Sequence, residues 1–135
     1  MILVSACMAG FRCRYDAKVV SNGEITELVR TGQAVPVCPE MLGGMPCPRI
    51  PCERTPNGVT ARDGTDQTQA FLLGAEETLR IAKLYGCDRA ILKAKSPSCG
   101  KGRIYDGTFS GTLTDGSGLT AELLEQNGIA VEVRE

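Results

Sequence analysis

Short apolar runs and longer segments of helical periodicity alternate along this chain of 135 residues. Four short runs are typical of buried β-strands and cover Ile2–Ala6, Val35–Val37, Ala90–Leu92 and Ile129–Val133. Apolar residues at helical spacing predict helices from Ser21–Asn22 to Gly32, from Gln67 to Tyr85 and from Leu119 to Asn127. Thr65–Asp66 is expected to cap the longest of these helices.

A long segment from Pro39 to Gly58 interrupts this alternation. It is rich in Gly and contains prolines that argue against a helix, at Pro39, Pro46, Pro48, Pro51 and Pro56. We therefore expect an irregular loop here, and a loop of this length in a compact domain is usually functional or disordered. Tyr105–Phe109 is expected to form a turn or a short extra strand.

The order strand, helix, strand, loop, helix, strand, helix, strand is typical of an α/β protein. The length fits one domain, and neither a repeat nor a linker divides residues 1–135. We therefore predict a single three-layer α/β sandwich around a mainly parallel sheet, with a Rossmann-like or flavodoxin-like arrangement.

The composition argues against several classes of partner. The formal net charge is -1, which gives no electrostatic case for binding nucleic acid or an acidic membrane. The chain has three Tyr, three Phe and no Trp, too few aromatic residues for a platform that stacks bases. The first residues lack the pattern of a signal peptide, and no segment is apolar enough to span a membrane. We expect a cytoplasmic protein with reduced thiols.

Cysteine and histidine counts narrow the chemistry further. There are seven cysteines, an odd number, so a disulfide framework is not expected in a reducing compartment. There are no histidines, which excludes Ser–His and Cys–His nucleophile pairs and every zinc site with a histidine ligand. Metal binding or thiol chemistry is favoured as a result.

Cysteines follow three of the predicted strands. Cys7, Cys38 and Cys99 each lie in a loop just beyond the end of a strand. The carboxyl ends of parallel strands share one edge of the sheet, where open α/β sheets bind ligands, so these cysteines should converge. Three thiolates at one edge suit a soft metal or an iron–sulfur cluster.

The last of these loops is the most distinctive stretch of the chain. Its residues Ser96, Ser98 and Cys99 are held by a Pro and Gly-rich turn, with Lys93 and Lys95 nearby. A cysteine among cations and free N–H groups is expected to be a thiolate.

The remaining thiols give weaker signals. Cys87 follows a helix and precedes a strand, so we expect a core thiol. Three more cysteines lie in loops near the same edge: Cys13, Cys47 and Cys52. Each could be a spare thiol, a fourth ligand or part of a redox pair.

Without histidine, a carboxylate is the natural proton carrier. Glu40 stands two residues after Cys38 and is within reach of anything bound there. The alternative role for Glu40 is a helix cap or a salt bridge with Arg49. Asp16, Lys93 and Lys95 are weaker candidates for proton or charge handling.

Motifs spread over the whole chain resemble one family. They are Ser5-Ala-Cys7-Met-Ala-Gly10, Cys13-Arg-Tyr-Asp16, Val37-Cys-Pro-Glu40, Gly43-Gly-Met-Pro-Cys-Pro-Arg49, Lys93-Ala-Lys-Ser-Pro-Ser-Cys-Gly100 and Tyr105-Asp-Gly107. Together, in this order, they resemble the thiouracil desulfidase family (domain of unknown function 523).

The resemblance implies a 4Fe-4S cluster with three cysteine ligands, one open iron and a thiolated small-molecule substrate. Water replaces the substrate's sulfur without net redox change. The ligands fall on Cys7, Cys38 and Cys99, and the proton-handling residues on Glu40 and Ser96. The sequence departs from the family's pattern at Cys47 and Cys52, which leaves open a fourth ligand or a different reaction.

Two other functions remain compatible with the sequence. One is a sensor or binding protein that holds a cluster or metal without turnover. The other is a thiol-redox protein that uses Cys47 and Cys52.

Overall fold

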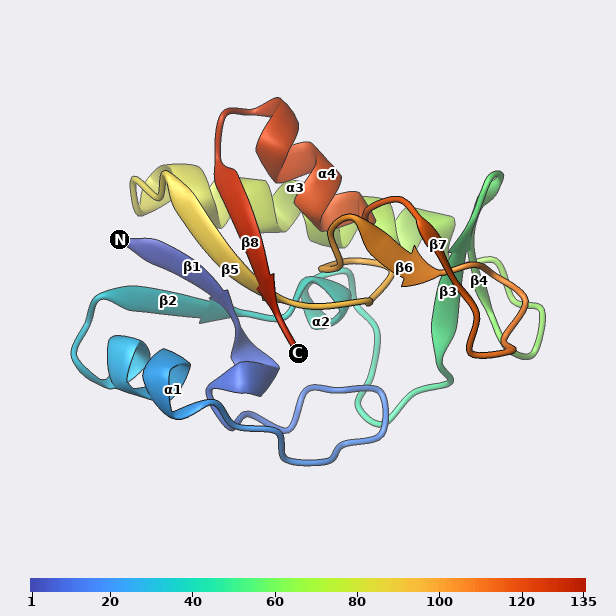
Figure 1. Ribbon diagram of the computed structural model, residues 1–135, viewed down its shortest axis with the longest axis horizontal. Coiled ribbons are helices and arrows are strands. Elements are labelled where there is room, and N and C mark those ends of the chain that lie inside the picture. Colours follow the sequence, from blue (N-terminus) through green and yellow to red (C-terminus); the bar gives the residue numbers. More distant parts are fainter.

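A four-stranded parallel sheet forms the centre of the molecule in the computed structural model, which describes residues 1–135 (Figure 1). Its strands stand in the order β2-β1-β5-β8. They are β1 (Ile2–Ser5), β2 (Ala34–Val37), β5 (Arg89–Lys93) and β8 (Ala130–Arg134). After β1 the chain forms β2 on one side of it and later forms β5 on its other side. The strand order therefore reverses between β1 and β5, as in flavodoxin-like folds.

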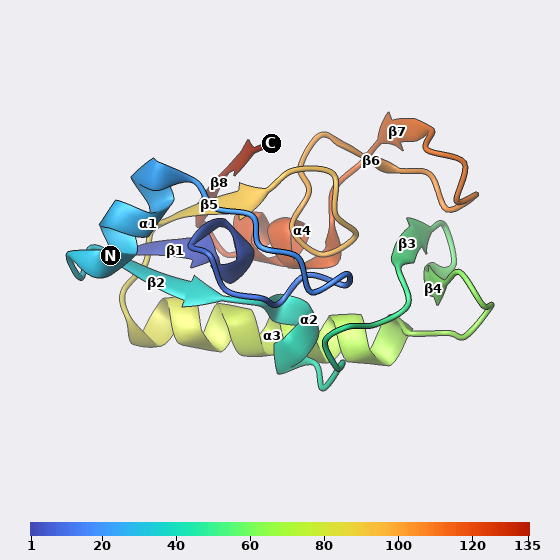
Figure 2. The same cartoon turned by 90° about the horizontal axis from the view of Figure 1, so that it is seen from below.

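Helices cover both faces of this sheet (Figure 2). Alternate residues of a strand face opposite sides, so Leu3 packs in the cluster that contains helices α3 (Thr68–Leu84) and α4 (Leu119–Gln126). Its neighbour Val4 packs on the other face with Ile25 of helix α1 (Gly23–Arg30). The predicted α/β sandwich with a parallel sheet is confirmed.

The predicted helices and core strands are all present, with ends shifted by a few residues. Asn22 caps α1, as expected, because its Oδ1 accepts a hydrogen bond from Ile25 N–H at 3.2 Å. At α3 the residue before the helix is Gln67, while Asp66 Oδ1 accepts the N–H and the hydroxyl of Thr68 at 3.0 and 2.6 Å. Asp66 therefore supplies the capping carboxylate, as predicted, and the helix begins one residue later than predicted.

The prediction that residues 39–58 contain no regular element is wrong. Pro39 begins a short helix, α2 (Pro39–Leu42), because a first-turn residue needs no N–H donor and the ring already has helical φ. The segment then enters a hairpin made of β3 (Cys52–Thr55) and β4 (Gly58–Ala61). Only the residues between α2 and β3 are irregular.

A second hairpin forms where a turn or a short strand was expected. It pairs β6 (Arg103–Tyr105) with β7 (Leu113–Asp115). Both hairpins lie beyond the carboxyl ends of the central strands (Figures 1 and 2). The buried Glu53 of β3 joins them, because its Oε1 accepts N–H groups from Gly107 and Phe109 at 2.9 and 3.1 Å.

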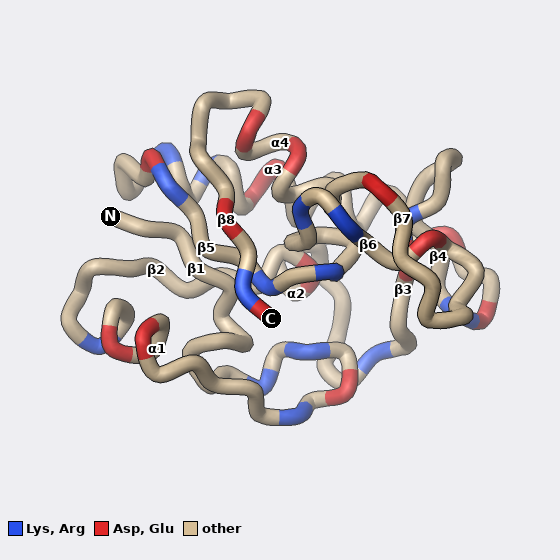
Figure 3. The backbone as a smooth tube through the Cα atoms, viewed as in Figure 1, with Lys and Arg blue, Asp and Glu red and all other residues tan.

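Charged residues of both signs are interspersed over the molecule (Figure 3). None of its helices combines the length and the apolar character that crossing a membrane requires.

Candidate functional site

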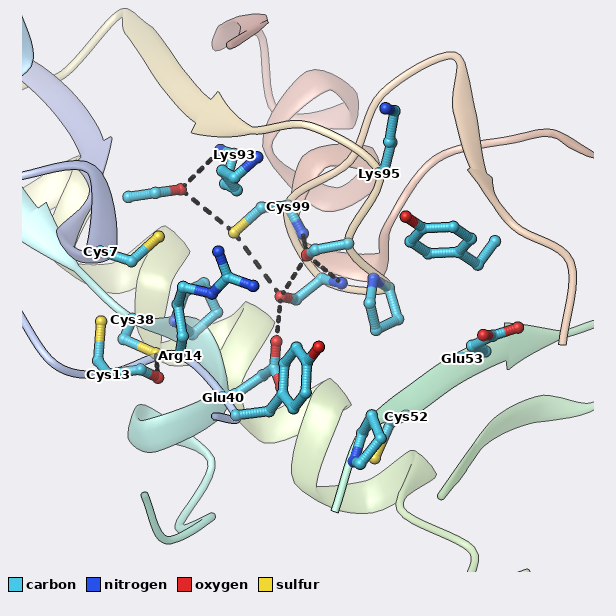
Figure 4. Close-up of a pocket in the computed structure, with 18 of the residues that line it drawn as sticks. Cys7, Cys13, Arg14, Cys38, Glu40, Cys52, Glu53, Lys93, Lys95 and Cys99 are labelled. Atoms are coloured by element: carbon cyan, nitrogen blue, oxygen red, sulfur yellow. Dashed lines mark hydrogen bonds between the residues drawn. The ribbon is translucent and has the colours of Figure 1, made fainter. Parts of the chain in front are cut away.

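A cavity of about 450 Å³ lies at the carboxyl edge of the sheet, and Cys7, Cys38 and Cys99 all line it (Figure 4). Cys7 lies in the 3₁₀ turn that follows β1, and Cys38 directly follows β2. Cys99 lies in the loop that follows β5. Their expected convergence is confirmed, at the edge where the strand order reverses and where such sheets bind ligands.

The loop that carries Cys99 is held in place by the start of α4. The first N–H groups of a helix have no partner within it. Here Leu119 N–H donates to Pro97 O at 2.9 Å, and Thr120 N–H donates to Ser98 O at 3.0 Å. A Cβ on Gly118 would lie 2.4 Å from the backbone carbon of Ser98, so only glycine permits this close approach. The helix therefore fixes the position of the Cys99 loop.

A buried serine ties β1 to the same loop. Ser5 Oγ accepts the N–H of Lys93 at 2.9 Å and donates to Cys99 Sγ at 3.4 Å. A polar residue that ends an otherwise apolar strand, directly before a cysteine motif, is the sequence signal for this contact. Ser5 thus brings the ends of the two central strands into register around the cavity.

Cys13 lies between Cys7 and Cys38, within hydrogen-bond reach of both thiols. The hydrogen bond from Cys13 lowers the pKa of Cys38 to about 6, and Arg49 adds to this effect. The same donor lowers the pKa of Cys7, with further help from Lys93 and Arg14. The two neighbouring thiols raise the pKa of Cys13, which therefore keeps its proton. Cys7 and Cys38 each have a pKa lowered toward the thiolate form, although the charge on Cys38 opposes ionisation of Cys7.

The third predicted ligand has a different environment. Burial raises the pKa of Cys99 to about 12, although Ser5 donates a hydrogen bond to its sulfur. The expectation that Cys99 is a thiolate because of surrounding lysines is wrong for this reason. Lys95 pairs with Glu135 at 3.0 Å, and the neighbouring Lys101 pairs with Glu125 at 3.0 Å.

Glu40 belongs to α2 and lines the cavity close to the thiols. Both of its carboxylate oxygens are engaged: Arg49 Nε donates to Oε1 and Ser98 Oγ donates to Oε2, each at 3.1 Å. The salt bridge with Arg49 considered as an alternative role exists, and the carboxylate still reaches the cavity. The ion pair with Arg49 therefore does not remove the Glu40 carboxylate from the cavity.

From the sequence, Arg49 is expected only as a possible salt-bridge partner of Glu40, but in the structure it also lines the cavity. Its side chain is only 5% exposed, and its Nη2 donates to Cys13 O at 2.8 Å. The same nitrogen lies 4.0 Å from Cys38 Sγ. A lone arginine inside a Pro-rich loop is the available sequence signal, but its contacts with Cys13 and Cys38 join residues that are distant in sequence.

The other candidate residues divide into two groups. Those that line the cavity are Lys93, Lys95, Ser96, Cys13 and Cys52. Asp16 and Cys47 do not line it. Asp16 pairs with Arg14 at 3.3 Å, and the Cys47 thiol donates to carbonyls of Arg12 and Arg14 at 2.9 and 3.0 Å.

Cys52 and Cys87 both pack among buried apolar side chains. Cys52 packs with Val59 and Phe71, and burial raises its pKa to about 11. Cys87 packs in the main core, as expected, and burial raises its pKa too. All seven cysteines are free thiols.

The mouth of the cavity carries aromatic and cationic residues that the sequence did not single out. Arg14 lies 5.7 Å from the ring centre of Tyr15, and Arg62 lies 5.7 Å from that of Phe109. All four line the cavity, together with Tyr105. Planar groups of this kind can hold a flat heteroaromatic substrate.

The donor set fits an iron–sulfur cluster. Five cysteines line one cavity, and thiolate sulfur is the ligand that such clusters take. No three His, Cys, Asp or Glu side chains are arranged to hold a single metal ion. Soft donors spread around a cavity fit a group larger than one ion.

Comparisons with known proteins agree with this geometry. The model of the 2-thiouracil desulfurase family matches residues 2–135. The chain belongs to this family. A protein of Bacillus subtilis (strain 168), the uncharacterized protein YbbK, is 45% identical over 142 residues, which cover 97% of this chain and 93% of that protein.

A solved structure shows the same fold in this desulfurase family. It is the 4Fe-4S-dependent thiouracil desulfidase TudS, with a TM-score of 0.93 and 41% sequence identity. The match covers 98% of this chain and 89% of that chain.

Proposed function

We propose that this member of the 2-thiouracil desulfurase family is a cluster-dependent desulfidase that replaces the sulfur of a thiouracil-like compound with oxygen from water. The observation that carries the proposal is one cavity at the strand-order reversal that collects Cys7, Cys38, Cys99 and the carboxylate of Glu40. Family membership and the likeness to TudS support the same reaction.

Cys7, Cys38 and Cys99 would hold a 4Fe-4S cluster in this proposal. Each comes from the end of a different parallel strand, which presents three sulfurs from three directions. When bound through three cysteines, such a cluster supplies an iron without a protein ligand, a Lewis-acid site for a soft thiocarbonyl sulfur.

Glu40 acts as the base in the proposed reaction. Water attacks the thiocarbonyl carbon, its proton passes to the Glu40 carboxylate, and sulfur leaves as sulfide with the oxo compound as product. No electron is gained or lost overall. The chain has no histidine. Of the other carboxylates that line the cavity, Glu53 accepts two backbone N–H groups and Glu135 pairs with Lys95, so Glu40 is our candidate base.

Ser96 and the lysines complete the proposed machinery. Ser96 lines the cavity three residues before Cys99, where its hydroxyl can donate to the substrate's departing sulfur or ring nitrogen. Lys93 lines the cavity as well and can stabilise negative charge that develops on the substrate.

Substitution of Glu40 tests the proposal. Glu40→Gln keeps the size of the side chain and one acceptor oxygen but removes the base, together with the charge that pairs with Arg49. We expect the variant to retain iron and sulfide and to lose activity by roughly 10²–10⁴-fold, the contribution of a positioned acid or base. The measurement is sulfide release from 2-thiouracil under anaerobic conditions.

A matched control is Glu132→Gln, which disturbs an ion pair outside the cavity, where Arg134 Nη1 lies 2.9 Å from Glu132. This control should keep wild-type activity. Full activity in Glu40→Gln would remove Glu40 from the mechanism.

A further inference from the structure

Phe109 is a large apolar side chain that lines the cavity without belonging to the protein core. It lies in the loop between β6 and β7 and is half-buried, and none of the three clusters of packed apolar side chains includes it. Of the other two phenylalanines, Phe71 packs in a core cluster and Phe11 is exposed outside the cavity. Packing of the core therefore does not explain the position of Phe109.

The backbone at Phe109 has an unfavourable conformation. Its φ is +57°, in the left-handed region that residues other than glycine rarely adopt. Such a conformation persists only where the surrounding structure imposes it, and it occurs most often at functional sites. Here the strained residue is one that lines the cavity.

Glu53 holds this conformation from the neighbouring hairpin. The two hairpins lie side by side beyond the sheet (Figure 2). Glu53 is only 9% exposed, and its Oε1 accepts the N–H of Gly107 at 2.9 Å and that of Phe109 at 3.1 Å. Two N–H groups that converge on one anionic oxygen curl the backbone around it. The loop is closed independently by a bond from Asp106 N–H to Thr112 O at 3.0 Å, so Glu53 governs its tip.

The surface that Phe109 gives the cavity suits a flat, conjugated ring. One planar cation already stacks on it, because Arg62 Cζ lies 5.7 Å from its ring centre and both residues line the cavity. Stacking of a heteroaromatic base on an aromatic side chain raises affinity by about tenfold or more. A saturated ring of similar size is puckered and has no π-face, so it gains little from the same contact.

We propose that Phe109 is a specificity-determining residue against which the thiolated ring stacks, and that Glu53 is a positioning residue that holds Phe109 in place. The inference rests on the proposed desulfidase function and narrows its substrates to planar, conjugated thiocarbonyl rings in preference to saturated ones. Neither side chain forms or breaks a bond in the reaction. Loss of either therefore weakens binding and leaves the chemical step unchanged.

Substitution of Phe109 tests the stacking surface. Phe109→Leu keeps an apolar side chain on the same backbone but removes the ring. In anaerobically reconstituted protein we expect wild-type iron content and kcat, with a KM for 2-thiouracil raised about tenfold. Phe109→Tyr, which keeps the ring, should match wild type. Phe11→Leu is the matched control outside the cavity and should match it too.

A second readout needs no turnover. Equilibrium dialysis of iron-loaded protein measures the dissociation constants of uracil, which is planar, and of 5,6-dihydrouracil, which is puckered. In Phe109→Leu the constant for uracil should rise about tenfold, whereas that for 5,6-dihydrouracil should change by less than about twofold. The variant therefore loses the preference of the wild type for the planar ring.

Substitution of Glu53 tests its positioning role. Glu53→Gln keeps an acceptor oxygen for both N–H groups and should retain a KM near wild type. Glu53→Ala releases Phe109, so KM should rise about tenfold with kcat unchanged. Added to Phe109→Leu, Glu53→Ala should have little further effect, because the two residues act through one contact. Glu53→Met fills the space without accepting an N–H group and repeats the test if Glu53→Ala unfolds.

The outcomes separate this inference from the proposed function. An unchanged KM and unchanged uracil binding in Phe109→Leu would overturn it while sulfide release stands, and so would equal losses of uracil and 5,6-dihydrouracil binding. Additive effects of Glu53→Ala and Phe109→Leu would overturn the role of Glu53. A wild-type protein that holds its cluster and releases no sulfide would overturn the proposed function instead, and a selective loss of uracil binding in Phe109→Leu would still support the stacking surface.

Discussion

Side chains of the same type acquire different roles from their surroundings at the residue scale. Cys38 has its pKa lowered to about 6 by a hydrogen bond from Cys13, whereas burial raises that of Cys99 to about 12. In the proposed cluster site, Cys99 would release its proton when the cluster binds, which would couple binding to pH. The site combines predisposed thiolates with a thiol that responds to binding.

The first residue-scale prediction concerns the ligands. Replacing Cys7, Cys38 or Cys99 by Ser should abolish the cluster, because hydroxyl oxygen is a poor substitute for thiolate sulfur. Iron and sulfide analysis after anaerobic reconstitution measures this. Cys87→Ser, a matched change in the main core, should leave the iron content unchanged. A full complement of iron in any of the three ligand variants would show that the ligand set is wrong.

At the scale of elements, two close approaches hold the site's loops. Gly118 lets α4 contact the Cys99 loop, and Gly74 of α3 does the same for α2, which carries Glu40. A Cβ built on Gly74 would lie 1.9 Å from Pro39 O, and one built on Gly43 would lie 2.0 Å from Ala70 O. The α2–α3 crossing therefore requires glycine on both sides.

Substitution of Gly74 tests this crossing. Gly74→Ala has to push α2 away from α3, so we expect a loss of about 1–3 kcal/mol in the free energy of unfolding, typical of overpacking. Activity should also fall, because Glu40 moves with α2. Gly23→Ala is the matched control, since that helical glycine has nothing within 4 Å of the added Cβ. Denaturant unfolding of both variants decides the matter, and equal stability of Gly74→Ala and wild type would contradict the close packing.

Helices and strands with a clear hydrophobic pattern could be predicted from the sequence, whereas helix α2 and the hairpin β3–β4 could not. The apolar run at Ala90–Leu92 predicts its strand because burial on both faces demands it. Helix α2 has four residues and begins at a proline, so it carries no periodicity to detect. The hairpin β3–β4 is equally short, and its strands pack on only a small cluster.

Within the site, likewise, the position of the cysteines could be predicted from the sequence, whereas the contacts between distant loops could not. Convergence of Cys7, Cys38 and Cys99 follows from strand order, because parallel strands share a carboxyl edge. The contact of Arg49 with Cys13 O does not, since it joins loops 36 residues apart in sequence. The Ser98–Glu40 contact spans 58 residues, and only the folded chain reveals it.

For the whole molecule, the fold places the cavity where the direction of chain connection reverses. Strand β1 leads to β2 on one side and β5 leads to β8 on the other, which opens space between their loops. The two hairpins lie beyond this edge, and Glu53 links them. The sheet thus supplies the thiols, and the hairpins contribute to the mouth through Tyr105.

In the proposed function, this molecule replaces sulfur with oxygen by a hydrolytic route that needs no electrons. The most direct test of this route supplies anaerobically reconstituted protein with 2-thiouracil and no reductant, and measures sulfide and uracil together. We predict equal amounts of the two products over many turnovers. A protein that holds its full cluster yet forms no uracil, or that requires reductant for every turnover, would contradict the account.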